Sequence, residues 1–458
     1  MNDAPILIAG AGLTGLTAGT LLAEAGLPVV IAEREAGPGG LCRSFTMDGV
    51  LFDLGPHVYF VDPETPEGAF AASVLATLPV IRRPFAFAIE AGGRMWKFPN
   101  HFDFLRYPMR YKREVLAAML KKRPPLPEGP VSAAFELSEK CGPGLYQLLF
   151  KDLFRKKALM PTDALHHHWL ARVDRTVDNE LEPYRPGSKA AILRRVMKKL
   201  RERYFYPRDG FMAVTDALAA RFARAGGRLL CGAPVQAIIR ESGRESGRES
   251  GRVTAATVAG ETRPVSRVIW TAPINALNRL LGVNAAPLPC VNMLLVFLTY
   301  ARARRVPRPY VYTYHPDPGL IFNRISYPES LLREALPADR EGLCLEFNVS
   351  EDLRGLPHDA VMDRCVADVE RLGLYPASAL RERKAIELPE SMPVYGLDYE
   401  ARMRESFQAV RETGNLHAVG RQGGYYFCLT PGAISQGIKM AKSISPQAQK
   451  GEPVVARP

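Results

Sequence analysis

The sequence lacks long apolar runs. A membrane-spanning helix needs roughly 18–20 consecutive apolar residues, and the richest run of this 458-residue chain, 291–300, has only the length of a strand. The first residues enter an apolar strand without a basic segment or a cleavable apolar stretch, which predicts that there is no signal peptide. We therefore expect a globular protein without a membrane span.

Cysteine is scarce and scattered. The seven cysteines are odd in number, and no two of them form a CxxC pair. This distribution argues against a disulfide framework and against a cysteine-based zinc site. It fits a reducing compartment, so the predicted location is cytoplasmic.

Motifs for hydrolysis and metal binding are also missing. Neither a Walker loop nor a serine–histidine–aspartate set is evident, which argues against hydrolysis. His166, His167 and His168 are adjacent, but neighbouring residues on a helix point in different directions, and no acidic or cysteine partner lies at ligand spacing. We therefore predict no metal.

Acidic residues are too few to balance the basic ones, so the formal net charge is +12. The chain shows no nucleic-acid-binding motif, and we expect no nucleic acid partner. Residues 189–204 would place apolar side chains on one face of a helix with cations around them. That pattern suits peripheral contact with an anionic membrane, and packing within the protein's own domain is the alternative. The oligomeric state stays open.

What the sequence does contain is a dinucleotide-binding βαβ pattern at its start. An apolar strand leads into Gly10-x-Gly12-x-x-Gly15, a helical pattern follows, and a second apolar strand covers 29–32. The first glycine permits a tight turn, the second lets the backbone approach a pyrophosphate, and the third lets the helix pack on the strand. The helix N-terminus offers free N–H groups to the phosphates. Glu33 then ends the second strand, where a carboxylate binds ribose hydroxyls.

A second pattern follows the acid. It consists of the pair Gly39-Gly40, then Arg43, then the turn Asp53-Leu54-Gly55-Pro56-His57. Together with the glycine turn, this resembles the FAD signature of the superfamily of protoporphyrinogen oxidases, amine oxidases, phytoene-type desaturases and UDP-galactopyranose mutases. The resemblance implies FAD as the cofactor, with the glycine pair close to it. It also implies that Arg43 lies near the pyrophosphate or the flavin and that the 53–57 turn borders the isoalloxazine.

The last part of the chain resembles the segment that completes the FAD site in this superfamily. A strand ends in Gly420-Arg421, and a helix follows in which Thr430 is the expected N-cap and Pro431 the first helical residue. The resemblance implies that this helix points its N-terminus at the pyrimidine edge of the flavin. There its dipole would stabilise negative charge by about 0.3–2 kcal/mol. Cys428, just before the helix, is expected to be a buried structural thiol, with a redox role as the alternative.

The candidate site residues follow from these motifs and the resemblance. His57 and Arg421 are the candidate catalytic residues, although a turn histidine that is only hydrogen-bonded would give the same pattern at His57. Arg172 and Arg175 are candidate ligands for a pyrophosphate-bearing substrate, because arginine binds phosphate bidentately; surface cations are the alternative. The residues expected to bind FAD are Gly10, Gly12, Leu13, Thr14, Gly15, Glu33, Arg34, Gly39, Gly40, Leu41, Arg43, Gly55, Pro56, His57, Val235, Ala272, Gly420, Arg421, Gly432, Ala433 and Ile434.

We expect an α/β protein with a Rossmann-type, glutathione-reductase-like FAD-binding domain and a discontinuous α+β substrate domain. The first is assigned to 1–98, 205–275 and 393–445, the second to 99–204 and 276–392, and 446–458 forms a tail. Within the first domain, 241–252 holds three tandem Glu-Ser-Gly-Arg copies. Such a sequence cannot form a core, so we predict a solvated hairpin extension.

The sequence leaves three alternatives open for the function. One is an oxidoreductase that moves a hydride from a small-molecule substrate to the flavin, as an oxidase, dehydrogenase or desaturase. Another is a mutase-like, redox-neutral enzyme that acts on a sugar nucleotide with reduced FAD. A flavin-binding scaffold without turnover is the third.

Overall fold

The computed structural model describes residues 4–58, 64–83, 86–98, 107–120, 127–173, 204–245, 248–302, 310–332 and 336–445. Arg175, the tail and all of the 189–204 segment except Tyr204 lie outside these ranges. Among the described helices, none combines the length and apolarity that crossing a bilayer requires.

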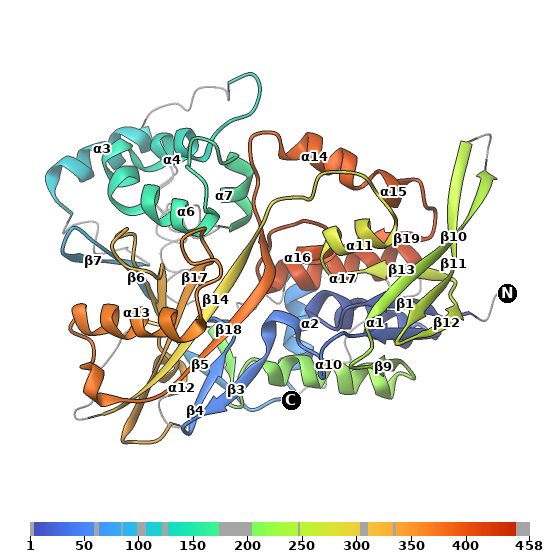
Figure 1. The fold of residues 1–458 in the computed structure, drawn as a ribbon, viewed down its shortest axis with the longest axis horizontal. Helices are drawn as coiled ribbons and strands as arrows, with labels where there is room; N and C mark the ends of the chain where they lie inside the picture. The colour runs from blue at the N-terminus through green and yellow to red at the C-terminus, as the bar shows by residue number, and fades with distance from the viewer. Residues whose placement is uncertain are drawn as a thin grey trace.

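A five-stranded parallel sheet in the order β19-β13-β1-β2-β9 forms the part of the molecule that the glycine turn belongs to (Figure 1). Its neighbouring strands pair in parallel throughout. The strands are β1 (Ile6–Ala9), β2 (Val29–Ala32), β9 (Arg228–Leu230), β13 (Arg267–Trp270) and β19 (Leu416–Ala418).

The parallel sheet is covered on both faces, because successive side chains of a strand point to opposite sides. Ile6 and Ile8 pack among helices, whereas Leu7 and Ala9 belong to the core on the other side. The helices that pack together on the first side are α1 (Leu13–Glu24), α2 (Pro66–Leu75), α10 (Met212–Arg224) and α17 (Thr430–Ile444). The second side holds β10 (Val235–Glu245), β11 (Arg248–Val258), β12 (Glu261–Pro264) and α11 (Ile274–Leu280).

A larger, seven-stranded sheet has the order β18-β14-β17-β16-β15-β6-β7, and only its β15–β6 pair is parallel. One face packs on α13 (His358–Arg371). Phe297 and Cys344, on the other face, share a core with Phe52 of the turn-bearing segment. The strands are β6 (Phe87–Ala91), β7 (Arg94–Phe98), β14 (Cys290–Ala301), β15 (Tyr312–Tyr314), β16 (Arg324–Ser326), β17 (Arg340–Asn348) and β18 (Leu380–Pro393).

The remaining elements are short strands and a helical cap. The strands pair as β3 (Ser44–Met47) with β4 (Val50–Asp53) and β5 (Val80–Arg83) with β8 (Tyr204–Pro207). The cap, at the upper left of Figure 1, holds α3 (Met109–Leu120), α4 (Ala133–Cys141), α5 (Pro143–Leu145), a π-helical turn (Tyr146–Phe150), α6 (Lys151–Ala158) and α7 (His167–Val173). Elsewhere lie α12 (Pro328–Leu332), α14 (Tyr399–Ser406), α15 (Gln408–Arg411), α16 (Gly420–Gly423) and 3-10 turns at Gly40–Cys42 and Ala377–Ala379.

The Glu-Ser-Gly-Arg repeat forms the hairpin that was predicted. Strands β10 and β11 continue through it as an antiparallel pair, which projects beyond the sheet at the right of Figure 1. In this register Glu241 lies opposite Arg252, Arg244 opposite Glu249, and Glu245 opposite Arg248. A four-residue repeat folded on itself therefore pairs acidic with basic positions in the register of the two strands.

Two expectations differ from the structure. Thr430 is the first residue of α17 and not its cap; Leu429 occupies the N-cap position, and no side chain caps this end. Strands β6 and β7 lie in the segment assigned to the FAD-binding domain, yet they hydrogen-bond into the seven-stranded sheet. An edge strand joins whichever sheet offers free backbone groups, and sequence alone does not say which.

Candidate functional site

The predicted cofactor-binding motifs converge at one edge of the parallel sheet. Because all five strands run the same way, the segments that follow β1, β2, β13 and β19 leave the sheet at the same edge. They carry Gly10, Glu33, Ala272 and Gly420. In open α/β sheets, ligands bind at this carboxyl edge. The topology therefore brings together residues that lie as much as 400 positions apart in the sequence.

The glycine turn is shaped by three different constraints. Gly10 has φ +105°, and a side chain there would come within 2.6 Å of the Thr271 hydroxyl. A Cβ on Gly15 would lie 2.1 Å from the Gly10 carbonyl oxygen, so the close helix–strand contact requires glycine. A Cβ on Gly12 would meet no protein atom within 4 Å. The space beside Gly12 is thus left open, as the close approach of a pyrophosphate requires.

Glu33 is buried and holds the turn together. One carboxylate oxygen accepts a hydrogen bond from the Ala11 N–H at 2.7 Å, and the other accepts one from the Glu35 N–H at 2.9 Å. The backbone of Glu33 and Glu35 accepts hydrogen bonds from residues 232 and 233, directly before Val235. Val235 therefore lies close to Glu33, although its strand β10 belongs to the three-stranded sheet. Arg34 is mostly exposed and pairs with Glu35.

The glycine pair lies directly against the turn. The Gly39 N–H donates to the Ala11 carbonyl at 2.9 Å, and a Cβ on Gly40 would lie 3.2 Å from the Gly12 Cα. Arg43 donates from Nε to the Gly40 carbonyl and lies 3.4 Å from a Glu35 carboxylate oxygen. Leu41 is half-buried within the intervening 3-10 turn. Two segments thirty residues apart in sequence thus form one glycine-lined surface.

The N-termini of α1 and α17 lie side by side, since the Thr14 hydroxyl donates to the Ala433 carbonyl at 3.0 Å. Neither helix has a side-chain cap or an acidic residue in its first turn. The first N–H groups of both helices are therefore available to an anion. Gly432 and Ile434 belong to the first turns of α17, and Ile434 is buried against the core.

His57 is neutral and has a fixed tautomer. Its Nδ1 lies 2.9 Å from the Gly55 carbonyl oxygen, which can only accept, so Nδ1 carries the proton and Nε2 keeps its lone pair. The ring stacks on Phe211. Burial, with a smaller contribution from the nearby Arg324 and Arg421, lowers the pKa of His57 from 6.5 to about 4. Residue 57 thus presents a hydrogen-bond acceptor at neutral pH.

Arg421 lies close enough to His57 and Glu346 to affect their electrostatics. It donates to the carbonyls of Ser391 and Cys428 and stacks over Phe427. Among the described residues it has no ion-pair partner, and burial lowers the pKa of its guanidinium. Gly420 is fixed by a hydrogen bond from its N–H to Gln436 of α17. Cys428 is buried, as expected.

The sequence analysis missed the ion pair between Arg324 and Glu346. Their strands pair so that these two residues lie directly opposite each other. Burial alone would lower the pKa of Arg324, but the Glu346 carboxylate and two tyrosines more than compensate for it, and the pKa is raised. A Cβ on Gly55 would lie 3.3 Å from a Glu346 oxygen and 3.7 Å from an Arg324 nitrogen. The large sheet therefore supplies an ion pair directly beside the 53–57 turn.

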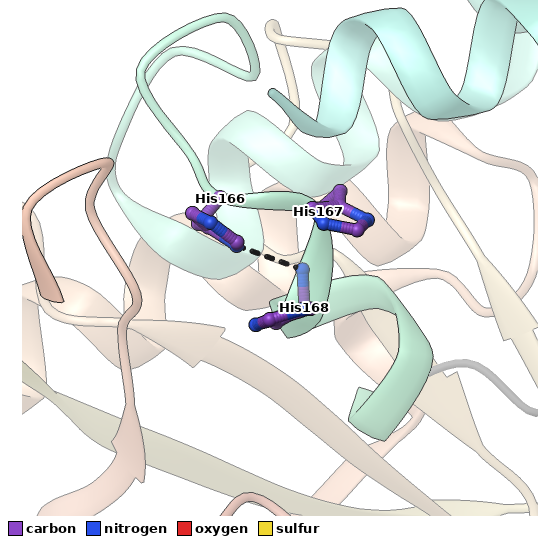
Figure 2. Close-up of side chains that lie close together, drawn as sticks. All are labelled: His166, His167 and His168. Carbon is purple, nitrogen blue, oxygen red and sulfur yellow. Dashed lines mark hydrogen bonds between the residues drawn. The ribbon is translucent and has the colours of Figure 1, made fainter. Parts of the chain in front are cut away.

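The three histidines do lie together, contrary to the premise of the sequence argument. Figure 2 shows their rings gathered at the start of α7, and their ligand atoms lie within 4.8 Å of one another. The His168 N–H donates to His166 Nδ1 at 3.1 Å, and His168 Nδ1 lies 2.5 Å from the Tyr399 hydroxyl. The neutral His166 ring therefore carries its proton on Nε2. A tetrahedral metal ion, with bonds of about 2.0–2.1 Å to nitrogen, needs its ligand nitrogens closer together than 4.8 Å. The absence of a metal stays a prediction.

Arg172 lies on α7, but its side chain is not among those that the structure describes, and Arg175 is outside the described residues. A cavity of about 360 Å³ lies elsewhere, against the loop between β15 and β16. Its walls include Glu90, Asp152 and His315, and none of the predicted site residues. This cavity is therefore separate from the site at the sheet edge.

Comparisons with known proteins agree with this architecture. The family described as flavin containing amine oxidoreductase matches residues 13–445. A zeta-carotene-forming phytoene desaturase of Myxococcus xanthus is 42% identical over 67 residues, 15% of this chain and 13% of that protein. A hydroxyneurosporene desaturase of Rubrivivax gelatinosus is 43% identical over 54 residues, 12% and 10% of the two chains. The matched stretches thus span only about a tenth of these relatives.

Solved structures resemble the whole chain. Reduced UDP-galactopyranose mutase aligns with a TM-score of 0.74 at 17% identity, covering 99% of this chain and 96% of that one. Putrescine oxidase bound to putrescine aligns with a TM-score of 0.55 at 16% identity, covering 96% and 98%. At these identities the likeness establishes the fold. The match to a flavin family begins in the glycine turn, and the backbone at Gly12 leaves open space beside it. Together these observations identify FAD as the cofactor.

Proposed function

Because the chain belongs to the family of flavin-containing amine oxidoreductases, we propose that it removes a hydride from a small-molecule substrate beside the 53–57 turn. FAD, when bound, supplies the hydride acceptor. The substrate is oxidised in the manner of an oxidase, dehydrogenase or desaturase. The cytoplasm is its proposed location, which agrees with seven unpaired cysteines.

The FAD-binding residues are proposed to act in three groups. The glycine turn of Gly10, Gly12 and Gly15 holds the pyrophosphate at the N-terminus of α1. Glu33 binds the ribose, with Val235 beside it. Arg43 and Ala272 border the pyrophosphate, and residues 432–434 meet the pyrimidine edge of the flavin with the N–H groups of α17. The open space at Gly12 and the uncapped helix ends support this assignment.

The observation that carries the proposal is the state of His57. A neutral imidazole with Nδ1 held by Gly55 keeps Nε2 as an acceptor that no described residue occupies. Such a nitrogen can orient a substrate N–H or O–H, or accept its proton as the hydride leaves the adjacent carbon. Arg421, a cation without a carboxylate partner among the described residues, would stabilise negative charge that develops during the transfer.

The test starts from the purified protein. It should be yellow, with a flavin-to-protein ratio near one, and anaerobic addition of a substrate should bleach the flavin. The redox-neutral mutase is the second candidate, since its fold aligns over the whole chain. A mutase would turn over only after reduction by dithionite and would leave the product at the redox level of the substrate. A flavin that no donor bleaches and that is inert after reduction would contradict both.

A further inference from the structure

Cationic side chains outnumber carboxylates around the proposed reaction site. The cations are Arg324, Arg421 and Lys157, and the carboxylates are Glu346 and Asp53, of which Asp53 is hydrogen-bonded to Ser44 and Tyr206. Arg421 and Lys157 have no ion-pair partner among the described residues. His57 is neutral and adds no charge. The described part of the site therefore carries an excess of positive charge, which a bound anion would neutralise.

Arg324 is held in a fixed orientation. Its guanidinium lies 5.1 Å from the ring centre of Tyr312 and 5.7 Å from that of Tyr314. One terminal nitrogen donates to Glu346, and the other lies 3.4 Å from the Tyr314 hydroxyl. Its Nε is buried without a hydrogen-bond partner among the described residues, and 16% of the side chain remains exposed. The arginine thus keeps donor capacity that this part of the protein does not use.

Lys157 extends the positive surface from a different element. It comes from α6, and its ammonium lies 5.0 Å from the centre of the Tyr314 ring and 3.5 Å from that hydroxyl. Tyr314 therefore lies between two cations. Its hydroxyl is available to an anion that both cations attract, since a phenol can donate as well as accept.

The cluster lies within reach of the reacting position. Gly55, whose carbonyl holds His57, lies against both members of the Arg324–Glu346 pair. Arg324 and Arg421 both act on His57 through space. A substrate whose reacting carbon lies at His57 would place a second group at Arg324.

We infer that the substrate carries an oxyanion, a carboxylate or a phosphate, and that Arg324 binds it with help from Tyr314 and Lys157. This inference rests on the proposed function, because it assumes that the substrate reacts at His57. It also separates this chain from enzymes that act on alkylammonium substrates. Like charges repel at short range in a partly exposed site, so a protonated amine is disfavoured here.

Two isosteric probes of opposite charge test the inference on the FAD-loaded enzyme. Benzoate and benzylammonium are titrated separately, and inorganic pyrophosphate is a third ligand that represents phosphates. Binding is read from the change in the visible flavin spectrum. We expect at least one anion to bind more tightly than benzylammonium; benzoate or pyrophosphate as the tighter ligand then distinguishes a carboxylate from a phosphate. Tighter binding of benzylammonium than of both anions would overturn the inference.

Variants of Arg324 test whether this residue binds the anion. Arg324→Met should weaken anion binding about tenfold or more, the loss of one charged hydrogen-bonding partner. Because this change leaves Glu346 without its partner, the double variant R324M/E346Q removes both charges of the pair and leaves the net charge of the site unchanged. Arg383→Met is the matched control, since Arg383 lies on the same sheet and pairs with Asp359 and Asp363 at the surface. Unchanged anion affinity in both Arg324 variants would contradict the assignment.

The two proposals fail separately. An enzyme that is bleached by a donor but binds no anion keeps the proposed function and loses the inference. A protein that binds benzoate through Arg324 but transfers no hydride from any donor keeps the anion site and loses the proposed function.

Discussion

Single residues decide whether the glycine turn can hold a cofactor. Gly12 and Gly15 lie three positions apart, yet a methyl group would meet entirely different surroundings at the two sites. At Gly12 it would enter the open space proposed for the pyrophosphate, and at Gly15 it would meet the Gly10 carbonyl. The same substitution therefore separates cofactor binding from folding.

Gly12→Ala should leave the stability of the FAD-free protein unchanged and weaken FAD binding. Gly12 has φ −76°, which alanine adopts without strain. Gly15→Ala should lower the free energy of unfolding by about 1–3 kcal/mol, because overpacked atoms force the backbone apart. Thermal melts of the FAD-free variants and FAD titrations by fluorescence measure the two effects. Equal losses of stability would show that Gly12 also packs against protein.

At the scale of elements, the hairpin of β15 and β16 presents Tyr314 and Arg324 to the site, and α6 holds it in place. The Lys156 ammonium donates to four backbone carbonyls in the loop between these strands, at His315, Asp317, Leu320 and Phe322. Burial lowers the pKa of Lys156 to about 8, so the ammonium persists at neutral pH. The adjacent Lys157 then contacts Tyr314.

Lys156→Met should therefore lower the free energy of unfolding by roughly 2–3 kcal/mol, because the four loop carbonyls would lose their hydrogen bonds to a charged donor. It should also weaken binding of the anionic probe, since the loop no longer fixes Arg324. Lys151→Met, at an exposed position of the same helix, is the control and should change neither quantity. Chemical denaturation gives the stability. A variant as stable as the control would show that the four hydrogen bonds are replaced by water without loss.

The repeat hairpin, in contrast to Lys156, is expected to contribute little to stability. Replacing 243–250 with Asn-Gly keeps the paired base of the hairpin and removes its projecting end. We expect the melting temperature to stay within about 1 °C, because no hydrophobic contact is lost, and the flavin content to stay unchanged. A clear drop in either would assign this extension a structural or binding role.

At the scale of the whole molecule, two partly buried histidines make stability depend on pH. Burial and the neighbouring Arg267 lower the pKa of His417 from 6.5 to about 4, and His57 is lowered similarly. Both stay neutral in the folded protein, whereas the unfolded chain takes up protons near pH 6.5. Stability is therefore present above that value and is lost as the pH falls from 6.5 toward 4. Asp53 opposes the trend, because burial raises its pKa to about 6.

His417→Gln separates these contributions. The variant should lose less stability between pH 7 and pH 5 than the wild type, since Asp53 and His57 act equally in both proteins. Urea denaturation at the two pH values measures the difference. An identical pH dependence would mean that His417 already carries its proton in the folded state.

The parts of the molecule that sequence could predict are those set by local patterns. The turn at Gly10–Gly15, the strand that ends at Glu33 and the hairpin of the repeat depend on neighbours in the chain, and they are found as expected. The Arg324–Glu346 pair depends on the register between two strands, which no local pattern specifies; only the spacing of Tyr312 and Tyr314 indicated a shared face. The closeness of the three histidine rings could not be predicted from helical periodicity, because His166 precedes the helix; the prediction that they bind no metal is untested.

The account depends most on chemistry at His57, and one measurement tests that directly. The rate of anaerobic flavin bleaching by a donor is compared between the wild type and His57→Asn at pH 7. Because asparagine cannot accept the substrate proton, we predict a fall of about 100-fold or more, with the flavin-to-protein ratio near one in both. Equal rates at equal flavin content would contradict the account, because the hydride transfer would then not depend on this residue.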